Sequence, residues 1–302
     1  MEYDVIIIGA GPSGISASLY TVRANKKTLV LYEDKAGLEK ANKIENYYGF
    51  ENGITGEELY NIGIKQAKNL GVDVKKEEVI KIEMNSDMYS NNDNVNENKN
   101  STSKYRFLVT TSNGLYKAKV VILATGNKKN KPKIKGIEKF EGKGVSYCAI
   151  CDGFFYRNKD VVVIGSGDYA ISETNDLINV VKDVTILTNG EKAPDFRADN
   201  VKIETRGIKE IKGDTKVDEV VLDDGTNLKI DGVFVAQGVA GSSDFAKKLG
   251  ALTNKDNIVV NENMETNVEG LFACGDCTGG LLQVSKAVYE GAIAGLEAIR
   301  KC

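Results

Sequence analysis

The amino terminus places a glycine-rich turn directly between an apolar strand and a helix. The predicted strand covers Tyr3 to Ile8, the turn reads Gly9-Ala10-Gly11-Pro12-Ser13-Gly14, and the helix is expected to run to about Asn25. A second predicted strand, Thr28–Tyr32, ends in Glu33, 19 positions beyond the last glycine of the turn. Glycines let a pyrophosphate approach the backbone, the helix N-terminus favours its charge, and the acidic residue bonds ribose hydroxyls. The pattern predicts a βαβ unit that binds a dinucleotide.

The same plan recurs in the second half of the chain. A predicted strand, Val161–Ile164, leads into Gly165-Ser166-Gly167-Asp168-Tyr169-Ala170, which is followed by a helix to about Val181 and a strand at Val184–Leu187. The two glycine turns begin 156 positions apart, which favours two related domains over a single sheet. The predicted fold is α/β, with two nucleotide-binding, Rossmann-like domains, the second inserted into the first. The predicted boundaries are 1–126 with 242–302 for the first domain and 127–241 for the second.

Composition limits the classes of protein to which the chain can belong. The 302 residues include 40 basic and 43 acidic side chains, a balance that argues against a general nucleic-acid binder. No stretch approaches the ~20 apolar residues that a membrane span needs, and no basic leader follows Met1, so a cytoplasmic location is expected. Histidine is absent, which excludes imidazole as base, nucleophile or metal ligand. Residues 85–103 hold seven Asn and predict a solvated loop.

A pair of cysteines carries the second chemical signal. The segment reads Cys148-Ala149-Ile150-Cys151-Asp152, a CxxC followed directly by a carboxylate. In a chain with no visible export signal, such a pair is more often redox-active or metal-bound than a static disulfide. One thiolate attacks a partner disulfide and the second resolves the mixed disulfide. Because the chain lacks histidine, Asp152 is the nearby candidate proton donor and acceptor.

A zinc site is the competing interpretation of the cysteines. Cys274-Gly275-Asp276-Cys277 is a second CxxC and would complete a set of four thiolate ligands. The two pairs are separated by 122 residues, whereas zinc sites usually place them ~15–20 residues apart. We therefore expect no metal. Cys277 and Cys302 receive no role from the sequence.

The motifs taken together resemble those of the low-molecular-weight flavin thioredoxin reductases over nearly the whole chain, and the segment Cys148–Phe155 is the most specific element. The resemblance implies FAD held by the outer segments, a redox dithiol on the inserted domain, thioredoxin as the partner and a homodimer. It also implies that Cys151 faces the flavin, Cys148 exchanges with thioredoxin and Asp152 is the acid. The FAD-lining positions that it implies are Gly9, Gly11, Pro12, Ser13, Gly14, Glu33, Asn46, Val79, Ala124, Thr125, Gly126, Gly275, Asp276 at the ribityl chain, and Gln283 and Val284 by the flavin ring.

The second glycine turn departs from the NADPH-dependent members of that family. They carry His-Arg-Arg where this chain reads Thr188-Asn189-Gly190, and an adenosine 2′-phosphate needs a guanidinium or ammonium group. Between Asn158 and Ile299 the arginines are Arg197 and Arg206, of which Arg197 keeps NADPH possible. Only residues 188–200, with Pro194 among them, connect two predicted strands, which leaves no room for a crossover helix.

These deficits direct the choice of electron donor. The chain resembles the clostridial subgroup that takes electrons from ferredoxin, so ferredoxin is the predicted donor and NADPH the alternative. A flavin-holding redox sensor without turnover is a second alternative. Acidic ferredoxins would dock on a basic patch. One candidate patch comprises Lys128, Lys129, Lys131, Lys133 and Lys135, although a solvated linker is the favoured interpretation of this stretch.

Overall fold

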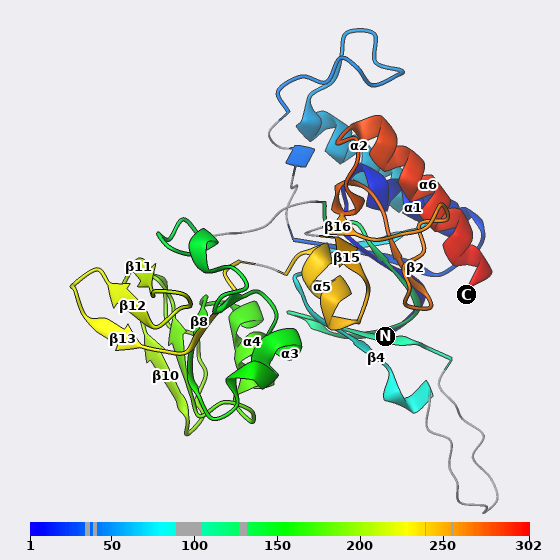
Figure 1. Cartoon of the computed structure of the whole chain (residues 1–302). Coiled ribbons are helices and arrows are strands. Elements are labelled where there is room, and N and C mark those ends of the chain that lie inside the picture. The colour runs from blue at the N-terminus through cyan, green and yellow to red at the C-terminus, as the bar shows by residue number, and fades with distance from the viewer. Residues whose placement is uncertain (34–36, 39–40, 89–103, 127–131, 239, 255–256) are drawn as a thin grey trace, which may run out of the picture. The chain divides into compact units, whose positions relative to one another are not determined.

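A computed structural model describes residues 1–33, 37–38, 41–88, 104–126, 132–238, 240–254 and 257–302 (Figure 1). The chain forms two compact units, one made of residues 1–128 and 241–302 and the other of residues 129–240. The α/β fold with two Rossmann-like units, the second inserted into the first, is confirmed. Most of the Asn-rich loop at 85–103 lies outside the described residues. None of the described helices is long and apolar enough to cross a membrane.

The first unit is built on one mixed sheet in the order β3-β2-β1-β6-β5-β4. Strand β1 pairs in parallel with β2 and β6 along its length, and Val5, Ile6 and Ile7 are fully buried. Two strands pair with β6 along the same edge. The first half of β6 pairs antiparallel with β5, and its last three residues pair in parallel with β17. The strands are β1 (Glu2–Ile8), β2 (Thr28–Tyr32), β3 (Asp73–Lys76), β4 (Val79–Met84), β5 (Phe107–Thr111), β6 (Gly114–Leu123), β17 (Leu271–Ala273), and the hairpin β15 (Thr253–Asn254) and β16 (Asn257–Ile258).

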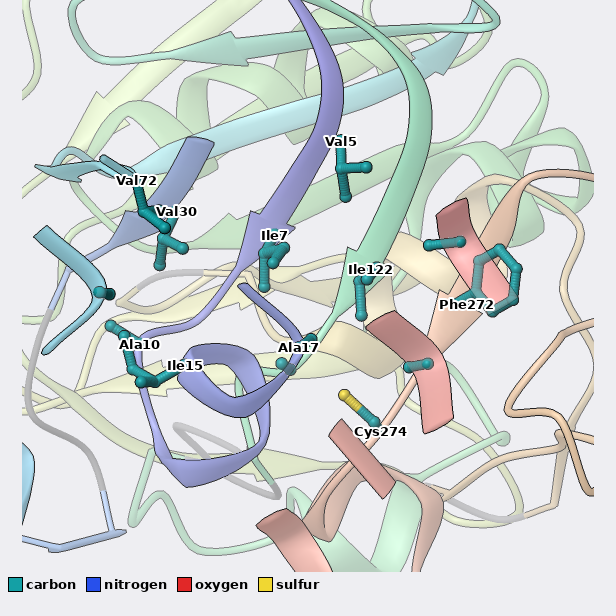
Figure 2. Packing of buried hydrophobic residues seen from close by; sticks show 14 of the residues in the cluster. Val5, Ile7, Ala10, Ile15, Ala17, Val30, Val72, Ile122, Phe272 and Cys274 are labelled. Atoms are coloured by element: carbon teal, nitrogen blue, oxygen red, sulfur yellow. The ribbon is translucent and has the colours of Figure 1, made fainter. Parts of the chain in front are cut away.

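Two helices of the first unit pack on each other through small residues. Gly291 and Gly295 of α6 face the backbone of α1, so close that an added Cβ would meet Ser13 O at 2.1 Å and Ala17 O at 2.6 Å. Figure 2 shows Ala17 among the buried side chains around Ile7, Ile122 and Cys274. Helix α2 begins with the predicted capping box, in which Thr55 and Glu58 bond each other's backbone N–H. The helices are α1 (Pro12–Arg23), α2 (Gly56–Asn69), α5 (Ser242–Lys248) and α6 (Val284–Arg300), with short 3₁₀ turns η2 (Ser86–Met88) and η5 (Asp276–Thr278).

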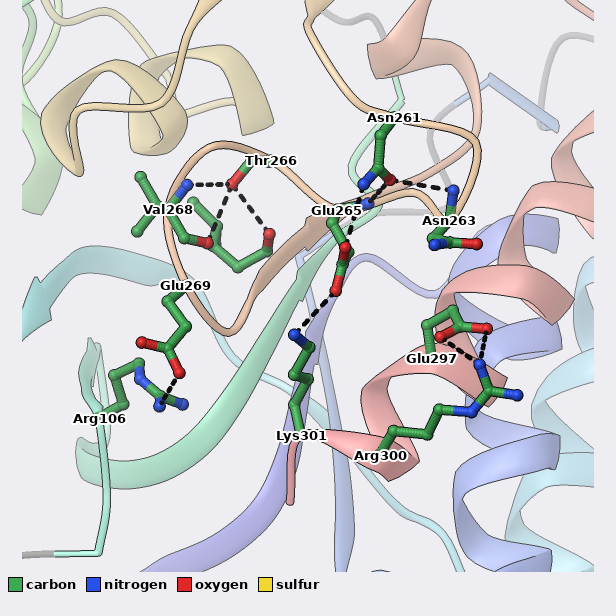
Figure 3. A network of polar contacts seen from close by, with 11 residues as sticks. Arg106, Asn261, Asn263, Glu265, Thr266, Val268, Glu269, Glu297, Arg300 and Lys301 are labelled. Carbon is green, nitrogen blue, oxygen red and sulfur yellow. Dashed lines mark hydrogen bonds and ion pairs between the residues drawn. The ribbon is translucent and has the colours of Figure 1, made fainter.

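A polar network fastens the segment that leads into β17. Asn261 accepts from the backbone N–H groups of Asn263 and Glu265, and Glu265 pairs with Lys301 at the end of α6 (Figure 3). Arg106 pairs with Glu269 at 2.8 Å. These contacts hold the turn before β17, so that this three-residue strand can dock on β6.

The second unit has a parallel sheet in the order β10-β9-β8-β14-β7 and a small antiparallel sheet, β11-β12-β13. Residues 188–200, all of them described, hold no helix between β9 and β10, so the expected loss of the crossover helix is confirmed. The strands are β7 (Val145–Ser146), β8 (Asp160–Ile164), β9 (Asp183–Leu187), β10 (Val201–Glu204), β11 (Ile208–Lys212), β12 (Glu219–Leu222), β13 (Asn227–Lys229) and β14 (Gly232–Val235); the helices are α3 (Ala149–Asp152), α4 (Asp168–Leu177), η3 (Glu138–Phe140) and η4 (Gly153–Tyr156).

Helix ends are the part of the prediction that needs correction. Helix α1 ends at Arg23, because Asn25 adopts a positive φ of 58° that no helix continues. Helix α4 ends at Leu177, four residues earlier than expected. Helix α6 begins at Val284 and not near Leu281, because Gln283 is extended at the N-cap.

Gly291 gives a direct test of the α1–α6 contact. We expect Gly291→Ala to lower the free energy of unfolding by about 1–3 kcal/mol, because its methyl group would overlap a backbone oxygen that cannot move freely. Thermal and urea unfolding measure the change. Gly63→Ala is the matched control, because Gly63 also lies within a helix of this unit, α2, and the nearest atoms that its added Cβ would meet are side-chain atoms of Ile15, at 3.4 Å or more. Equal stability of the Gly291→Ala and Gly63→Ala variants would show that the helices are not tightly packed there.

Candidate active site

The first glycine turn, Gly9 to Gly14, combines close packing with an open side. Gly9 has φ of 111°, and an added Cβ would meet Ala124 O at 2.3 Å. An added Cβ at Gly11, the N-cap of α1, would meet nothing within 4 Å, and Pro12 starts the helix. Glu33 is exposed directly after β2. The turn therefore leaves its backbone open at a helix N-terminus, as a pyrophosphate requires.

Three segments meet at the carboxyl end of the sheet beside this turn. Residues 124–126 follow β6 and Gly275 follows β17, and β6 pairs with both β1 and β17. An added Cβ at Gly275 would lie 2.4 Å from Ser13 Oγ. Thr125 and Ser242 bond each other through their hydroxyl groups and through both backbone N–H groups. The predicted positions Ala124, Thr125, Gly126, Ser13, Gly275 and Asp276 thus gather at one edge, where open α/β sheets bind their ligands.

A buried ion pair on α6 holds the Gly275–Gly279 loop. The Lys286 ammonium donates to the carbonyl oxygens of Gly275 at 2.8 Å and Gly279 at 2.6 Å, and to Thr278 Oγ1 at 2.9 Å. Glu290 Oε2 accepts from Gly275 N–H at 2.8 Å and pairs with Lys286 at 2.9 Å. The pair fixes the loop that carries Asp276, whose carboxyl pKa is raised by burial.

Two further predicted lining residues lie together. Asn46 Nδ2 donates to Gln283 Oε1 at 2.9 Å, which joins the segment after β2 to the N-cap of α6. Val284 is the first residue of α6. Val79 lies at the start of β4, where it is buried and pairs with Thr111 on the antiparallel side of the sheet. The structure therefore brings Asn46 and Gln283 together, and Val79 follows two residues after Glu77, whose N–H donates to the Tyr32 carbonyl oxygen at 2.9 Å at the end of β2.

The CxxC pair forms a disulfide at the start of α3. Cys148 is 4% exposed and occupies the N-cap, and Cys151, which is exposed, donates its backbone N–H to Cys148 Sγ at 3.2 Å. Such an N–H group would stabilise a thiolate at Cys148 after reduction. Cys148 N–H donates to Ser146 Oγ at 3.1 Å, and Ser146 Oγ donates to Asp152 Oδ2 at 2.7 Å. The hydroxyl group of Ser146 therefore links the predicted acid to the Cys148 backbone.

The other CxxC is chemically different. Cys274 and Cys277 are buried free thiols, and Cys277 Sγ lies 3.3 Å from the Cys274 carbonyl oxygen. Burial raises the pKa of Cys277 to about 12 and that of Cys274 well above its usual range, so both stay protonated at neutral pH. In the described part of the chain no cluster of Cys, Asp and Glu could hold a metal ion. Cys148 and Cys151 are bonded to each other.

The second glycine turn, Gly165 to Ala170, keeps the close packing of the first. Gly165 lies against β14 so closely that an added Cβ would meet Ala236 O at 2.2 Å. The side chain of Ser166 in this turn donates to Glu191 Oε2. Asn189 Oδ1 accepts from Ile208 N–H at 2.8 Å. Arg206 bonds Glu204 Oε1 at 2.9 Å and Asp224 at 2.6 Å.

Comparison with known proteins adds the family. The sequence profile described as "Pyridine nucleotide-disulphide oxidoreductase" matches residues 3–291. Thioredoxin reductase of Aquifex aeolicus is 38% identical, covering 96% of this chain and 90% of its own. The crystal structure of the atypical thioredoxin reductase TRi from Desulfovibrio vulgaris Hildenborough superposes with TM-score 0.83 at 36% identity, over 99% of this chain and 97% of that one. The chain belongs to the thioredoxin reductase family.

A second solved structure bears on the kind of reductase. A ferredoxin-flavin thioredoxin reductase from Clostridium acetobutylicum superposes with TM-score 0.64 at 34% identity, over 99% of this chain and 98% of that one. The resemblance drawn from the motifs is confirmed. FAD is the cofactor of this thioredoxin reductase, and the open first glycine turn with Glu33 fits it.

The sequence missed the residues that support the site from a distance. Five such residues bond a predicted site residue or a glycine turn: Ser146, Ser242, Lys286, Glu290 and Glu191. Ser146 lies two residues before the CxxC, so its place could have been noticed. The other four lie outside any motif, and only the folded chain brings them to the site.

Replacing Lys286 tests the ion pair that holds the Gly275–Gly279 loop. We expect Lys286→Met to raise the dissociation constant for FAD at least tenfold, about 1.4 kcal/mol, because the loop loses three hydrogen bonds and Glu290 loses its cation. Quenching of FAD fluorescence on titration with apoprotein measures it. Lys301→Met, which removes an ion pair with Glu265 near the end of the same helix, is the control and should bind like wild type. Unchanged affinity in the Lys286→Met variant would refute the clamp.

Proposed function

We propose that this thioredoxin reductase receives its electrons from a reduced ferredoxin and delivers them through FAD and the Cys148–Cys151 pair to thioredoxin. FAD supplies a carrier that accepts electrons singly and passes them on in pairs. The proposal assigns FAD to the first unit and the dithiol to the inserted unit. The observation that carries the choice of donor is in the second glycine turn, where the Ser166 side chain bonds the Glu191 carboxylate.

Three side chains at and near the second glycine turn are bonded within the chain. The Glu191 carboxylate bonds Ser166 inside the glycine turn, where a pyrophosphate would need positive potential, and like charges repel. Asn189, at the position of a 2′-phosphate ligand, is bonded to the backbone of Ile208. Arg206 is held by Glu204 and Asp224. Arg197 is exposed on the 188–200 segment and supports NADPH as the alternative donor.

The surface around the disulfide supports a protein substrate. Ile150, Phe154 and Phe155 are each at least half exposed beside Cys151, and exposed apolar clusters of this kind mark docking surfaces. We propose that thioredoxin docks here and that Cys148 attacks its disulfide. Asp152 is the proposed proton donor and acceptor for this exchange, acting through the Ser146 hydroxyl group. Because Cys148 is buried while Cys151 is exposed, attack by Cys148 requires that Cys148 Sγ become accessible.

Three further assignments remain proposals. A homodimer agrees with Tyr289 and Leu296, which are exposed seven residues apart on α6. A cytoplasmic location is also proposed. In the basic patch, Lys133 is exposed and Lys135 pairs with Glu210 at 2.9 Å, whereas Lys128, Lys129 and Lys131 lie outside the described residues.

An anaerobic titration tests the donor. We expect reduced ferredoxin to bleach the visible flavin absorption and sustain thioredoxin reduction, and NADPH or NADH to leave the spectrum unchanged, because the Glu191 carboxylate bonds Ser166 within the second turn and opposes a pyrophosphate there. Rapid bleaching by NADPH would contradict the proposal, and its loss in Arg197→Ala would then identify the 2′-phosphate ligand. No turnover with any donor would favour the redox sensor.

Single cysteine variants test the order of the thiols. Cys148→Ser should abolish thioredoxin reduction yet remain yellow, because the flavin site lies in the other unit. Cys151→Ser should trap a mixed disulfide with thioredoxin through Cys148, because no resolving thiol remains. Non-reducing electrophoresis and mass spectrometry identify the adduct. If Cys148→Ser forms the adduct and Cys151→Ser does not, Cys151 is the attacking thiol.

A further inference from the structure

One face of α4 supports the dithiol segment, which we define as residues 147–153. Tyr169 donates its hydroxyl to the Tyr147 carbonyl oxygen at 3.5 Å. One turn later, Glu173 Oε2 accepts from Ala149 N–H at 2.7 Å. A further turn on, Leu177 packs against Gly153, so that an added Cβ there would lie 3.0 Å from Leu177 Cδ2. The spacing of four residues places these three side chains on a single helix face.

Glu173 is the charged member of this face and is only 1% exposed. Its carboxylate bonds the N–H of the residue that follows Cys148, at the first turn of α3. An N–H group at a helix start ordinarily stabilises a neighbouring thiolate. Here one such group is taken by a carboxylate, whose charge in turn opposes a negative charge on Cys148 Sγ. Burial strengthens both effects, because water does not screen them.

We propose that Glu173 is a positioning residue that holds the start of α3 and keeps the Cys148–Cys151 pair strongly reducing. By disfavouring the thiolate, it destabilises the reduced form relative to the disulfide, so the dithiol gives up its electrons more readily. The inference rests on the proposed function, since it concerns the same redox pair. It gives α4, the helix that follows the second glycine turn, the role of supporting the dithiol segment.

Equilibration with glutathione measures this property directly. Two glutathione thiols reduce the Cys148–Cys151 disulfide, two electrons pass to the protein, and one glutathione disulfide forms, so that sulfur–sulfur bonds and protons balance. The ratio of dithiol to disulfide at known glutathione poise, read by alkylation and mass spectrometry, gives the equilibrium constant. The holoprotein is used throughout.

Glu173→Gln is the informative variant, because it removes the charge and keeps an oxygen that can accept the Ala149 N–H. We expect its equilibrium constant to shift at least threefold toward the dithiol, which for two electrons is about 14 mV more oxidising. Asp168→Asn loses the same charge from an exposed position at the start of α4 and should stay within twofold of wild type.

The possible outcomes separate the two proposals. A Glu173→Gln constant within twofold of wild type, or a shift toward the disulfide, overturns the role of Glu173 while leaving the thioredoxin reductase activity intact. A wild-type disulfide that does not exchange with glutathione or thioredoxin overturns the proposed function itself. If Glu173→Gln does not fold, as judged by its circular dichroism, Glu173→Ser removes the same charge and is compared in its place.

Discussion

Close backbone packing at the carboxyl ends of neighbouring parallel strands is the constraint on which the proposed flavin site depends. Gly9 fits against the Ala124 carbonyl and Gly275 against Ser13, and neither place has room for a side chain. This packing draws the ends of β1, β6 and β17 together and sets the N-terminus of α1 beside the segments after β6 and β17. The α6 glycines that press on α1, and the Lys286–Glu290 pair that holds the loop after β17, maintain the same arrangement from behind.

The inserted unit keeps the same packing around its own glycine turn. Gly165 contacts the Ala236 carbonyl as Gly9 contacts that of Ala124, so the strand–turn–helix geometry survives. The groups that would receive a dinucleotide have other partners: Ser166 bonds Glu191, and Asn189 bonds the backbone of Ile208. The crossover helix is missing between β9 and β10. Under the proposed function, the inserted unit keeps this fold as a scaffold for the dithiol.

Local pattern explains what the sequence could predict. The strands, both glycine turns, the capping box at Thr55 and the missing crossover follow from periodicity and spacing over a few residues, and the structure agrees. The helix ends depend on single backbone conformations, such as the positive φ of Asn25, that neighbouring residues do not announce. Glu173 and Glu290 act on backbone N–H groups 24 and 15 positions away, so no motif could reveal them. The roles of the predicted flavin-lining residues came from the family resemblance.

A carboxylate bonds each of three segments: the Gly275–Gly279 loop, the second glycine turn and the start of α3. Glu290 satisfies Gly275 N–H and is paired with Lys286, so its charge is neutralised and the loop can accept a flavin. Glu191 enters the second glycine turn and makes its potential unfavourable for a pyrophosphate. Glu173 bonds the start of α3 beside Cys148. The two glycine turns do not differ at their middle glycine, because an added Cβ would meet nothing within 4 Å at either Gly11 or Gly167. Under the two proposals, Glu191 sets which copy of the motif can hold an anion, and Glu173 sets how readily the dithiol releases electrons.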